Sequence, residues 1–188
     1  MTTTRCANRR QSGFTLIEAI IAILIVSIGI LALIAAYTQG FIFATASQYD
    51  YIAEKKAQEA IETIFTARDT KLITWQQICN VGGNCGGGGG GVFLAGPQPL
   101  LDPGPDGLVG TGDDDPNKPD KVVVGPGPDG ILGTADDDVI ILGMMTRTIA
   151  ITDIPGNPNL RQVTVTINYR VGQFNRQFIL VSYISSFA

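Results

Sequence analysis

The sequence lacks histidine entirely, and this absence narrows the functions open to it. Histidine is the commonest metal ligand and the side chain most often used as a general acid or base. A chain of 188 residues without it is a poor candidate for a zinc or acid–base enzyme, and we expect no catalysis. A basic patch is also lacking after the first ten residues, and the net charge is −4, so nucleic-acid binding has no electrostatic basis.

Charged residues are missing from a long stretch near the start of the chain. Between Ala19 and Tyr49 there is no Asp, Glu, Lys or Arg, and no proline occurs before Pro97. An apolar run of about 20 residues crosses a bilayer as a helix, and Ala19–Tyr37 alone reaches that length. Arginines precede it within the first ten residues, which favours a cytoplasmic N-terminus. A cleaved secretory signal is the alternative, but its apolar core is shorter and ends at a small-residue cleavage site.

Helix-forming sequence continues beyond the apolar run. The stretch Tyr51–Arg68 is rich in Ala, Glu and Lys, which favour helices. Apolar residues recur there at a spacing of three or four, as expected of a buried helical stripe: Ala53, Ala57, Ala60, Ile61, Ile64 and Phe65. We therefore predict one helix over residues 14–68, with residues 14–40 in the membrane and the rest packed on a head domain.

One carboxylate, Glu18, lies within the predicted membrane segment of residues 14–40, where an ionised group costs several kcal/mol. It belongs to the stretch Gly13–Ala19, GFTLIEA, which resembles the processing site of type IV prepilins and type II secretion pseudopilins. The resemblance implies that a prepilin peptidase removes a leader, residues 1–13, and N-methylates Phe14. It also implies that subunits pack through this helix, where the new amine of one copy meets Glu18 of a neighbour.

The resemblance further implies a fold, a location and partners. The expected class is α+β, a pilin-like long helix packed on a small antiparallel sheet. The proline-free run Ile28–Ala35 is more similar to minor subunits than to major ones. The expected function is a structural minor subunit that waits in the inner membrane as a single-pass protein with its head in the periplasm or outside. It would then enter a type IV pilus or a type II secretion pseudopilus. Expected partners are other such subunits, the prepilin peptidase, the inner-membrane assembly platform and the lipid bilayer, but no nucleic acid.

Residues 69–100 form a Cys- and Gly-rich segment that we predict to be a loop. Cys79 and Cys85 lie six positions apart, and in an exported chain they would close a small disulfide loop. Two free thiols are the alternative. The glycine run within Cys79–Gly91 lacks the preceding strand, the following helix and the closing Lys-Ser/Thr of a phosphate-binding loop, so we interpret it as a linker.

Residues 101–138 contain a duplicated motif rich in Asp, Gly and Pro. The stretch Asp102–Asp115 returns as Gly125–Asp138. Oxygen-rich loops with a Gly turn are typical of calcium sites, and the spacing is similar to part of the thrombospondin type 3 repeats. The alternating Asp before the Gly and the closing Glu of an EF-hand are both missing. The candidate ligands for two calcium ions are Asp106, Asp113 and Asp114 in the first copy, and Asp129, Asp136 and Asp137 in the second. A solvated acidic loop is the alternative.

Residues 139–188 alternate between apolar and polar side chains, as antiparallel strands do. We predict strands in Met144–Ile154 and Asp138–Leu142, and a hairpin in Arg161–Ile184 whose apolar face covers the helix stripe. Two other functions remain open. One is a membrane-tethered calcium-binding surface or adhesion module that never polymerises. The other is a membrane-anchored hydrolase using the Asp clusters, which is disfavoured because these carboxylates lie on turns without a rigid scaffold.

Overall fold

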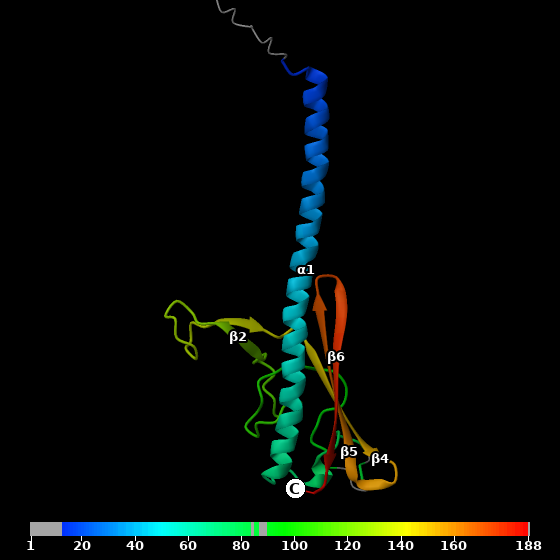
Figure 1. Ribbon diagram of the computed structural model, residues 1–188. Helices are drawn as coiled ribbons and strands as arrows, with labels where there is room; N and C mark the ends of the chain where they lie inside the picture. The colour runs from blue at the N-terminus through cyan, green and yellow to red at the C-terminus, as the bar shows by residue number, and fades with distance from the viewer. Residues whose placement is uncertain (1–12, 84, 87–89, 188) are drawn as a thin grey trace, which may run out of the picture. The chain divides into compact units, whose positions relative to one another are not determined.

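The computed structural model describes residues 13–83, 85–86 and 90–187, so the predicted leader except Gly13 lies outside the described residues. One long helix, α1 (Leu16–Asp69), opens the described chain (Figure 1). It confirms the helix predicted over residues 14–68, with small differences at both ends. The chain divides into two compact units, residues 1–43 and residues 44–188, and α1 contributes to both.

Thr15 explains why α1 begins where it does. Its hydroxyl accepts a hydrogen bond from the N–H of Glu18 at 3.4 Å, and its carbonyl accepts one from the N–H of Ala19 at 3.2 Å. A Thr followed three residues later by Glu is the pattern of a helix N-terminus, and a carboxylate in the first turn interacts favourably with the helix dipole. Glu18 therefore fits the local start of the helix.

The described part of the first unit is a helix that is apolar on every side. Residues 13–41 are exposed without exception. An 18-residue window of α1 has a mean hydropathy of 3.0, and this helix is long and apolar enough to cross a membrane. A helix that is apolar all round has to be surrounded by lipid or by other protein.

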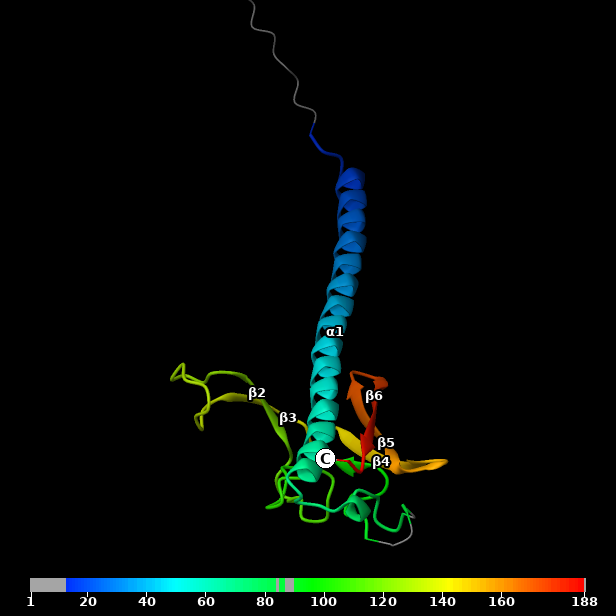
Figure 2. The ribbon, with the colours of Figure 1, turned by 60° about the horizontal axis from the view of Figure 1, so that its bottom comes forward.

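The second unit packs the remainder of α1 against a four-stranded antiparallel sheet (Figures 1 and 2). The strands are β1 (Gln98–Pro99), β4 (Thr146–Ile154), β5 (Asn157–Val171) and β6 (Phe174–Ser185), in the order β1-β4-β5-β6. Alternate strand residues and one helix stripe share a single core, and both were predicted from the sequence: Ile149, Ile151, Val163, Val165, Ile167 and Tyr169 from the strands, and Ala53, Ala57, Ala60 and Ile64 from the helix.

Two-residue turns join the long strands of this sheet. Val171 pairs with Phe174 around a turn that contains Gly172, whose φ is +59°. Ile154 pairs with Asn157 around Gly156, whose φ is +81°, but the β4–β5 register shifts between Asp153 and Ile154. Glycine adopts positive φ without steric cost, and the turn at Gly172 is continuous with the register of the whole β5–β6 pair. The hairpin predicted in Arg161–Ile184 is thereby confirmed as β5 and β6.

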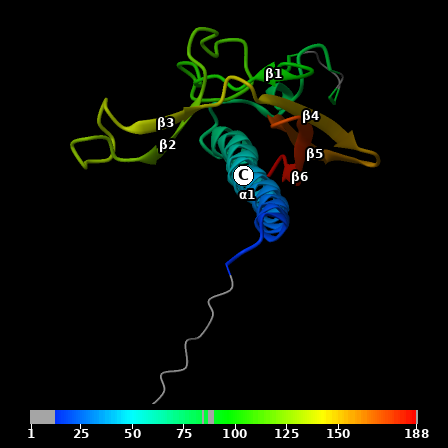
Figure 3. The same ribbon diagram turned by 90° about the horizontal axis from the view of Figure 1, so that it is seen from above.

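A second, two-stranded sheet consists of β2 (Lys121–Gly125) and β3 (Asp138–Ile141) (Figure 3). The sequence correctly predicted a strand at Asp138–Leu142, but it assigned that strand to the head sheet and it missed β2. The second copy of the duplicated motif lies between the two strands and reverses the chain, so β2 becomes the nearest partner for β3. The second copy is therefore the loop of a β-hairpin.

The segment 69–100 was predicted to be a loop, and several of its described residues on either side of the glycine run belong to the core of the second unit. A short 3-10 helix, η1 (Trp75–Gln77), precedes Ile78, and the side chains of Ile78, Phe93 and Leu100 are fully buried. Residues 84 and 87–89 of the glycine run lie outside the described residues. The predicted disulfide between Cys79 and Cys85 is formed.

Asn80 joins this segment to the head sheet. Its amide donates a hydrogen bond to the carbonyl of Ile149 at 2.7 Å and accepts one from the N–H of Ile151 at 2.8 Å. The side chain thus imitates a strand residue at the edge of β4, beyond the end of β1. Such side-chain bonds to the backbone satisfy an edge that would otherwise stay unpaired.

Candidate functional site

The predicted processing residues lie together at the start of the described chain. Gly13, Phe14 and Thr15 have no regular secondary structure, and the side chain of Phe14 is 83% exposed. The peptide bond between Gly13 and Phe14 is therefore in an open, non-helical segment immediately before α1. Glu18 follows in the first helical turn and is also exposed. This arrangement leaves both the bond and the carboxylate accessible to other proteins.

The first copy of the duplicated motif, which we call repeat 1 (Asp102–Asp115), uses its carboxylates to hold its own backbone. Asp106 accepts a hydrogen bond from the N–H of Leu108 at 2.7 Å. Asp114 accepts one from the N–H of Gly110, also at 2.7 Å. Asp side chains that bond to nearby backbone N–H groups stabilise turns. The carboxylates therefore have a structural role in the turn.

The second copy, repeat 2 (Gly125–Asp138), forms the same bonds at the equivalent positions. Asp129 accepts a hydrogen bond from the N–H of Ile131 at 2.8 Å, and Asp137 accepts one from the N–H of Gly133 at 2.7 Å. The sequence duplication is therefore a duplication of one turn structure. Each turn contains the same hydrogen bonds from its own side chains.

The predicted calcium ligands do not form a metal site in the described residues, which contain no group of three or more His, Cys, Asp or Glu side chains placed to hold a metal ion. A pocket of about 660 Å³ lies against repeat 1, and its lining includes Asp113, Asp114 and Asp115 together with Lys118. The carboxylates of both repeats are oriented toward backbone N–H groups and hydroxyls. Calcium binding by the repeats stays a prediction.

Hydroxyl groups adjust the acidity of one carboxylate in each repeat. The hydroxyl of Thr111 donates to Asp113 at 2.6 Å, and that of Thr134 donates to Asp136 at 2.7 Å. These bonds stabilise the ionised form, so the pKa values of Asp113 and Asp136 lie below their ordinary value. Burial has the opposite effect in repeat 1, where desolvation raises the pKa of Asp114 even though Arg147 attracts its charge.

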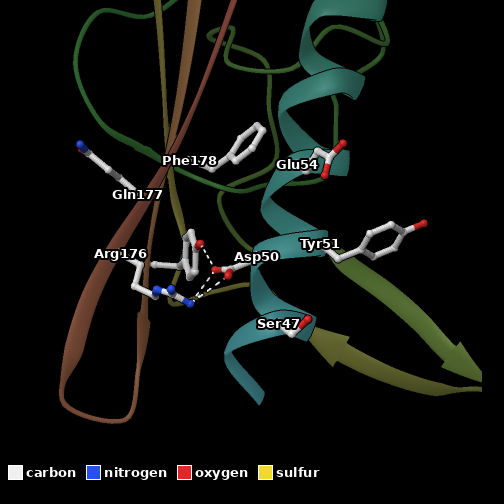
Figure 4. A pocket seen from close by; sticks show the side chains of 8 residues that line it. Ser47, Asp50, Tyr51, Glu54, Arg176, Gln177 and Phe178 are labelled. Atoms are coloured by element: carbon white, nitrogen blue, oxygen red, sulfur yellow. Dashed lines mark hydrogen bonds and ion pairs between the residues drawn. The ribbon is translucent and has the colours of Figure 1, made fainter. Parts of the chain in front are cut away.

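A pocket of about 500 Å³ lies between α1 and the start of β6 (Figure 4). Asp50 on α1 is its central group. The hydroxyl of Tyr169 donates to Asp50, and Arg176 donates to both of its carboxylate oxygens at 2.9 and 3.0 Å. A carboxylate that is engaged by a phenol and a guanidinium is not a free base. The cluster instead fastens the β5–β6 hairpin to the helix.

Tyr169 should therefore ionise late in alkaline solution. Its burial, together with the hydrogen bond to Asp50, raises the pKa of Tyr169 to about 12 from 10.0. Because the folded pKa lies above the unfolded one, the stability that this bond contributes is complete below pH 10 and is lost as the pH rises toward 12. We expect the alkaline loss of stability to shrink in Tyr169→Phe and to persist in the control Tyr183→Phe, whose ring is 56% exposed. Denaturant unfolding across this pH range measures it, and equal curves for the two variants would contradict it.

Two arginines in the core of the second unit were missed by sequence reasoning. Arg161 is completely buried. It pairs with Asp153 at 2.7 Å, donates to the carbonyls of Trp75 and Ile78, and stacks 4.2 Å from the ring centroid of Trp75. The signal was present, because Arg161 has the same parity in the strand as the inward-facing Val163. Alternation alone would therefore have placed it on the buried face.

The second of these residues, Arg147, is 1% exposed, and its three guanidinium nitrogens have no hydrogen-bond partner among the described residues. Its charge is compensated at longer range by Asp114 of repeat 1, by Glu59 on α1 and by Asp120, while burial lowers its pKa. Lys56 lies 2.7 Å from both Glu59 and Asp120. A group of buried and half-buried charges thus connects α1, β4 and repeat 1.

Comparison with family models gives a match at the start of the chain. Residues 8–34 match the family model described as the prokaryotic N-terminal methylation motif. No curated protein and no solved structure matches the chain. The matched range includes Gly13, Phe14 and Glu18, the three residues that the sequence assigned to processing and assembly, and it ends within the apolar part of α1.

Proposed function

Starting from the prepilin-type N-terminal methylation motif of residues 8–34, which is consistent with the type IV pilin and pseudopilin family, we propose that this chain is a processed minor subunit of a type IV pilus or a type II secretion pseudopilus. A prepilin peptidase would cut after Gly13 and methylate the new N-terminus at Phe14. The inner membrane would hold the mature chain by residues 14–40 until an assembly platform transfers it into a filament. The motif points to a structural family without enzymatic activity.

The observation that carries this proposal is the motif directly followed by a helix that is exposed on every side. Residues 13–41 expose apolar side chains around the whole circumference of α1. In water this surface would drive association, so it needs lipid before assembly and other subunits afterwards. A helix that serves only as a membrane anchor needs nothing more than an apolar stretch of sufficient length. The processing motif and Glu18 add the features that packing between subunits requires.

Glu18 is given its role by the charge that cleavage creates. Removal of the leader would leave an amine at Phe14, and methylation would keep that amine basic. Inside a bundle of apolar helices, the amine of one subunit and the Glu18 carboxylate of its neighbour attract more strongly than in water, although desolvation offsets much of the gain. The pair therefore favours one register of packing more than it adds stability.

The processing step is tested by the intact mass and N-terminal sequence of protein extracted from native membranes. We expect a chain that begins at Phe14 and carries one additional methyl group on its amine. The leader would be absent, and Cys6 with it. A chain that keeps its first 13 residues in cells with an active prepilin peptidase would refute the proposal.

The assembly step is tested by Glu18→Gln. Removing one partner of a buried ion pair costs about 3–5 kcal/mol, so we expect filament incorporation to fall at least about 100-fold while membrane insertion is unchanged. Glu62→Gln is the matched control, because Glu62 is an exposed carboxylate of the same helix within the second unit. Normal incorporation of the Glu18 variant would overturn the role given to Glu18, whereas an unaltered chain that never enters filaments would favour a membrane-tethered surface module that does not polymerise.

Calcium binding by the two repeats is a separate proposal. The carboxylates of each repeat already hold their own turn, so the processing and the helix packing described above do not depend on a metal ion.

A further inference from the structure

The two repeats form the same turn but have opposite environments. In repeat 1, the apolar pair Leu108 and Val109 is 2% and 1% exposed and belongs to the core of the second unit. The equivalent pair in repeat 2, Ile131 and Leu132, is 61% and 65% exposed. Because the bonds within the two turns are the same, the difference does not come from the turns themselves. It comes from the protein surface against which each apolar pair does or does not pack.

The groups that contact repeat 1 in the second unit show which kind of surface this turn packs against. The carbonyl of Gly110 accepts a hydrogen bond from the N–H of Leu94 at 2.8 Å. Ile149 packs so closely that a Cβ at Gly110 would lie 2.9 Å from its Cδ1. The buried guanidinium of Arg147 acts on the charge of Asp114 at longer range, without a hydrogen bond or an ion pair to it. The surface thus combines an inward apolar strand residue with an arginine that compensates the acidic turn.

Among the residues that the structure describes, no surface of this kind covers the Ile131–Leu132 pair of repeat 2. Repeat 2 forms the end of the β2–β3 hairpin, which lies on the opposite side of α1 from β5 and β6 (Figures 1 and 3). Within the described residues, no Lys or Arg forms an ion pair with Asp129, Asp136, Asp137 or Asp138. The hairpin therefore presents a preformed acidic turn with two large apolar side chains to its surroundings.

The outer face of β6 has the complementary composition. Ile179, Val181 and Tyr183 alternate along this strand and are 50%, 46% and 56% exposed. β6 is also an edge strand of the head sheet. Residues 154–188 contain no Asp or Glu, and they include the exposed Arg170 and the half-exposed Arg176. Residues 102–138, by contrast, contain ten Asp and only two Lys.

We propose that the Ile131–Leu132 turn of one copy docks on the outer face of β6 in a second copy, with Arg170 compensating the Asp residues of repeat 2. The contact would reproduce between subunits the apolar strand and arginine that receive repeat 1 within the chain. It buries exposed apolar area and pairs opposite charges, which favours association and fixes its orientation. This inference rests on the proposed function, because assembly is what brings two copies next to each other.

Cysteine cross-linking of the full chain in membranes and filaments tests the contact. In a Cys6→Ser background, one copy carries Leu132→Cys and a co-expressed copy carries Val181→Cys, and a short bismaleimide is added. We expect a covalent dimer only when both copies are present. The matched control pairs Met144→Cys, at a position 82% exposed and outside both surfaces, with Val181→Cys, and we expect at least about tenfold less dimer. A dimer from Leu132→Cys alone would overturn the proposal in favour of contact between two turns.

Ile20→Cys, introduced into both copies, separates failure of this contact from failure of the proposed function. Ile20→Cys on α1 should cross-link between copies whenever the helices assemble. If Ile20→Cys cross-links while Leu132→Cys and Val181→Cys do not, the docking proposal is wrong and the proposed function stands. If neither pair cross-links, two copies of this chain are not neighbours and the docking proposal is overturned, while the proposed function is decided separately by the N-terminus of the mature chain and by its incorporation into filaments.

Charge reversal provides the chemical test of the docking partner. Arg170→Asp should reduce the Leu132–Val181 cross-link at least about fivefold, because it adds a negative charge opposite the acidic turn. Asp138→Arg, at an exposed residue of the hairpin, should restore the cross-link when it is introduced into the partner copy. If Arg170→Asp only disturbed the fold of the subunit that carries it, a substitution in another subunit would not restore the cross-link. A cross-link that Asp138→Arg does not restore would therefore overturn the role of Arg170.

Discussion

Leu108→Ala should lower the free energy of unfolding of the second unit by about 2–5 kcal/mol, whereas Ile131→Ala should change it by less than about 0.5 kcal/mol. The two residues occupy equivalent positions of the duplicated turn. Leu108 is 2% exposed and lies in the core, so its truncation leaves a cavity. Ile131 is 61% exposed, so its truncation removes few contacts within the chain.

Denaturant unfolding of the detergent-extracted full chain, followed by tryptophan fluorescence, measures this difference. Trp75 is the only tryptophan and lies in the second unit, so the signal reports on that unit alone. The two variants serve as controls for each other, because an aliphatic side chain is shortened to Ala in the same turn. Equal losses would mean that both repeats are packed in the core, which would contradict the exposed end of the β2–β3 hairpin.

Arg161→Met should cost about 3–5 kcal/mol of the free energy of unfolding, the range for breaking a buried ion pair. Methionine keeps much of the volume but removes every donor. Asp153 then loses its charge partner, and the carbonyls of Trp75 and Ile78 lose their hydrogen bonds. Buried acceptors left without donors account for much of the expected cost.

Arg170→Met is the matched control on the same strand. Arg170 is exposed, and its hydrogen bond goes to the carbonyl of Gly172 in the adjacent turn, so we expect less than about 0.5 kcal/mol. Limited proteolysis gives a local readout, because Arg161 also holds the segment that carries the Cys79–Cys85 disulfide. We expect faster cleavage between residues 70 and 95 in Arg161→Met alone. An Arg161 variant as stable and as protease-resistant as Arg170→Met would contradict this role.

The regular elements were predictable because their signals are local. The charge-free run from Ala19 and the alanine stripe beyond it predict α1, since helical periodicity depends only on neighbouring residues. The alternation in Arg161–Ile184, with Gly172 at the turn, predicts β5 and β6 in the same way. The methylation motif was recognisable for a related reason, because Gly13, Phe14 and Glu18 are close together in the sequence.

The placement of β3 and the roles of the buried arginines were not predictable in the same way. Alternation predicts that Asp138–Leu142 is a strand but does not say which strand lies beside it. Arg147 and Arg161 have the parity of the buried face, but apart from Asp153 their partners come from segments far away in the sequence. Burial of an arginine depends on whether distant residues supply compensating charge and acceptors.

By itself the sequence determined the long apolar helix, the processing motif, the β5–β6 hairpin and the existence of two equal turns. Each depends on side chains within a few residues of one another. Only the tertiary structure decided that Leu108 and Val109 are buried while Ile131 and Leu132 are exposed. Burial is a property of what surrounds a turn, and the same local sequence can be placed against a core or at the end of a hairpin. The chain therefore encodes one turn twice, and its long-range packing gives the two copies different environments.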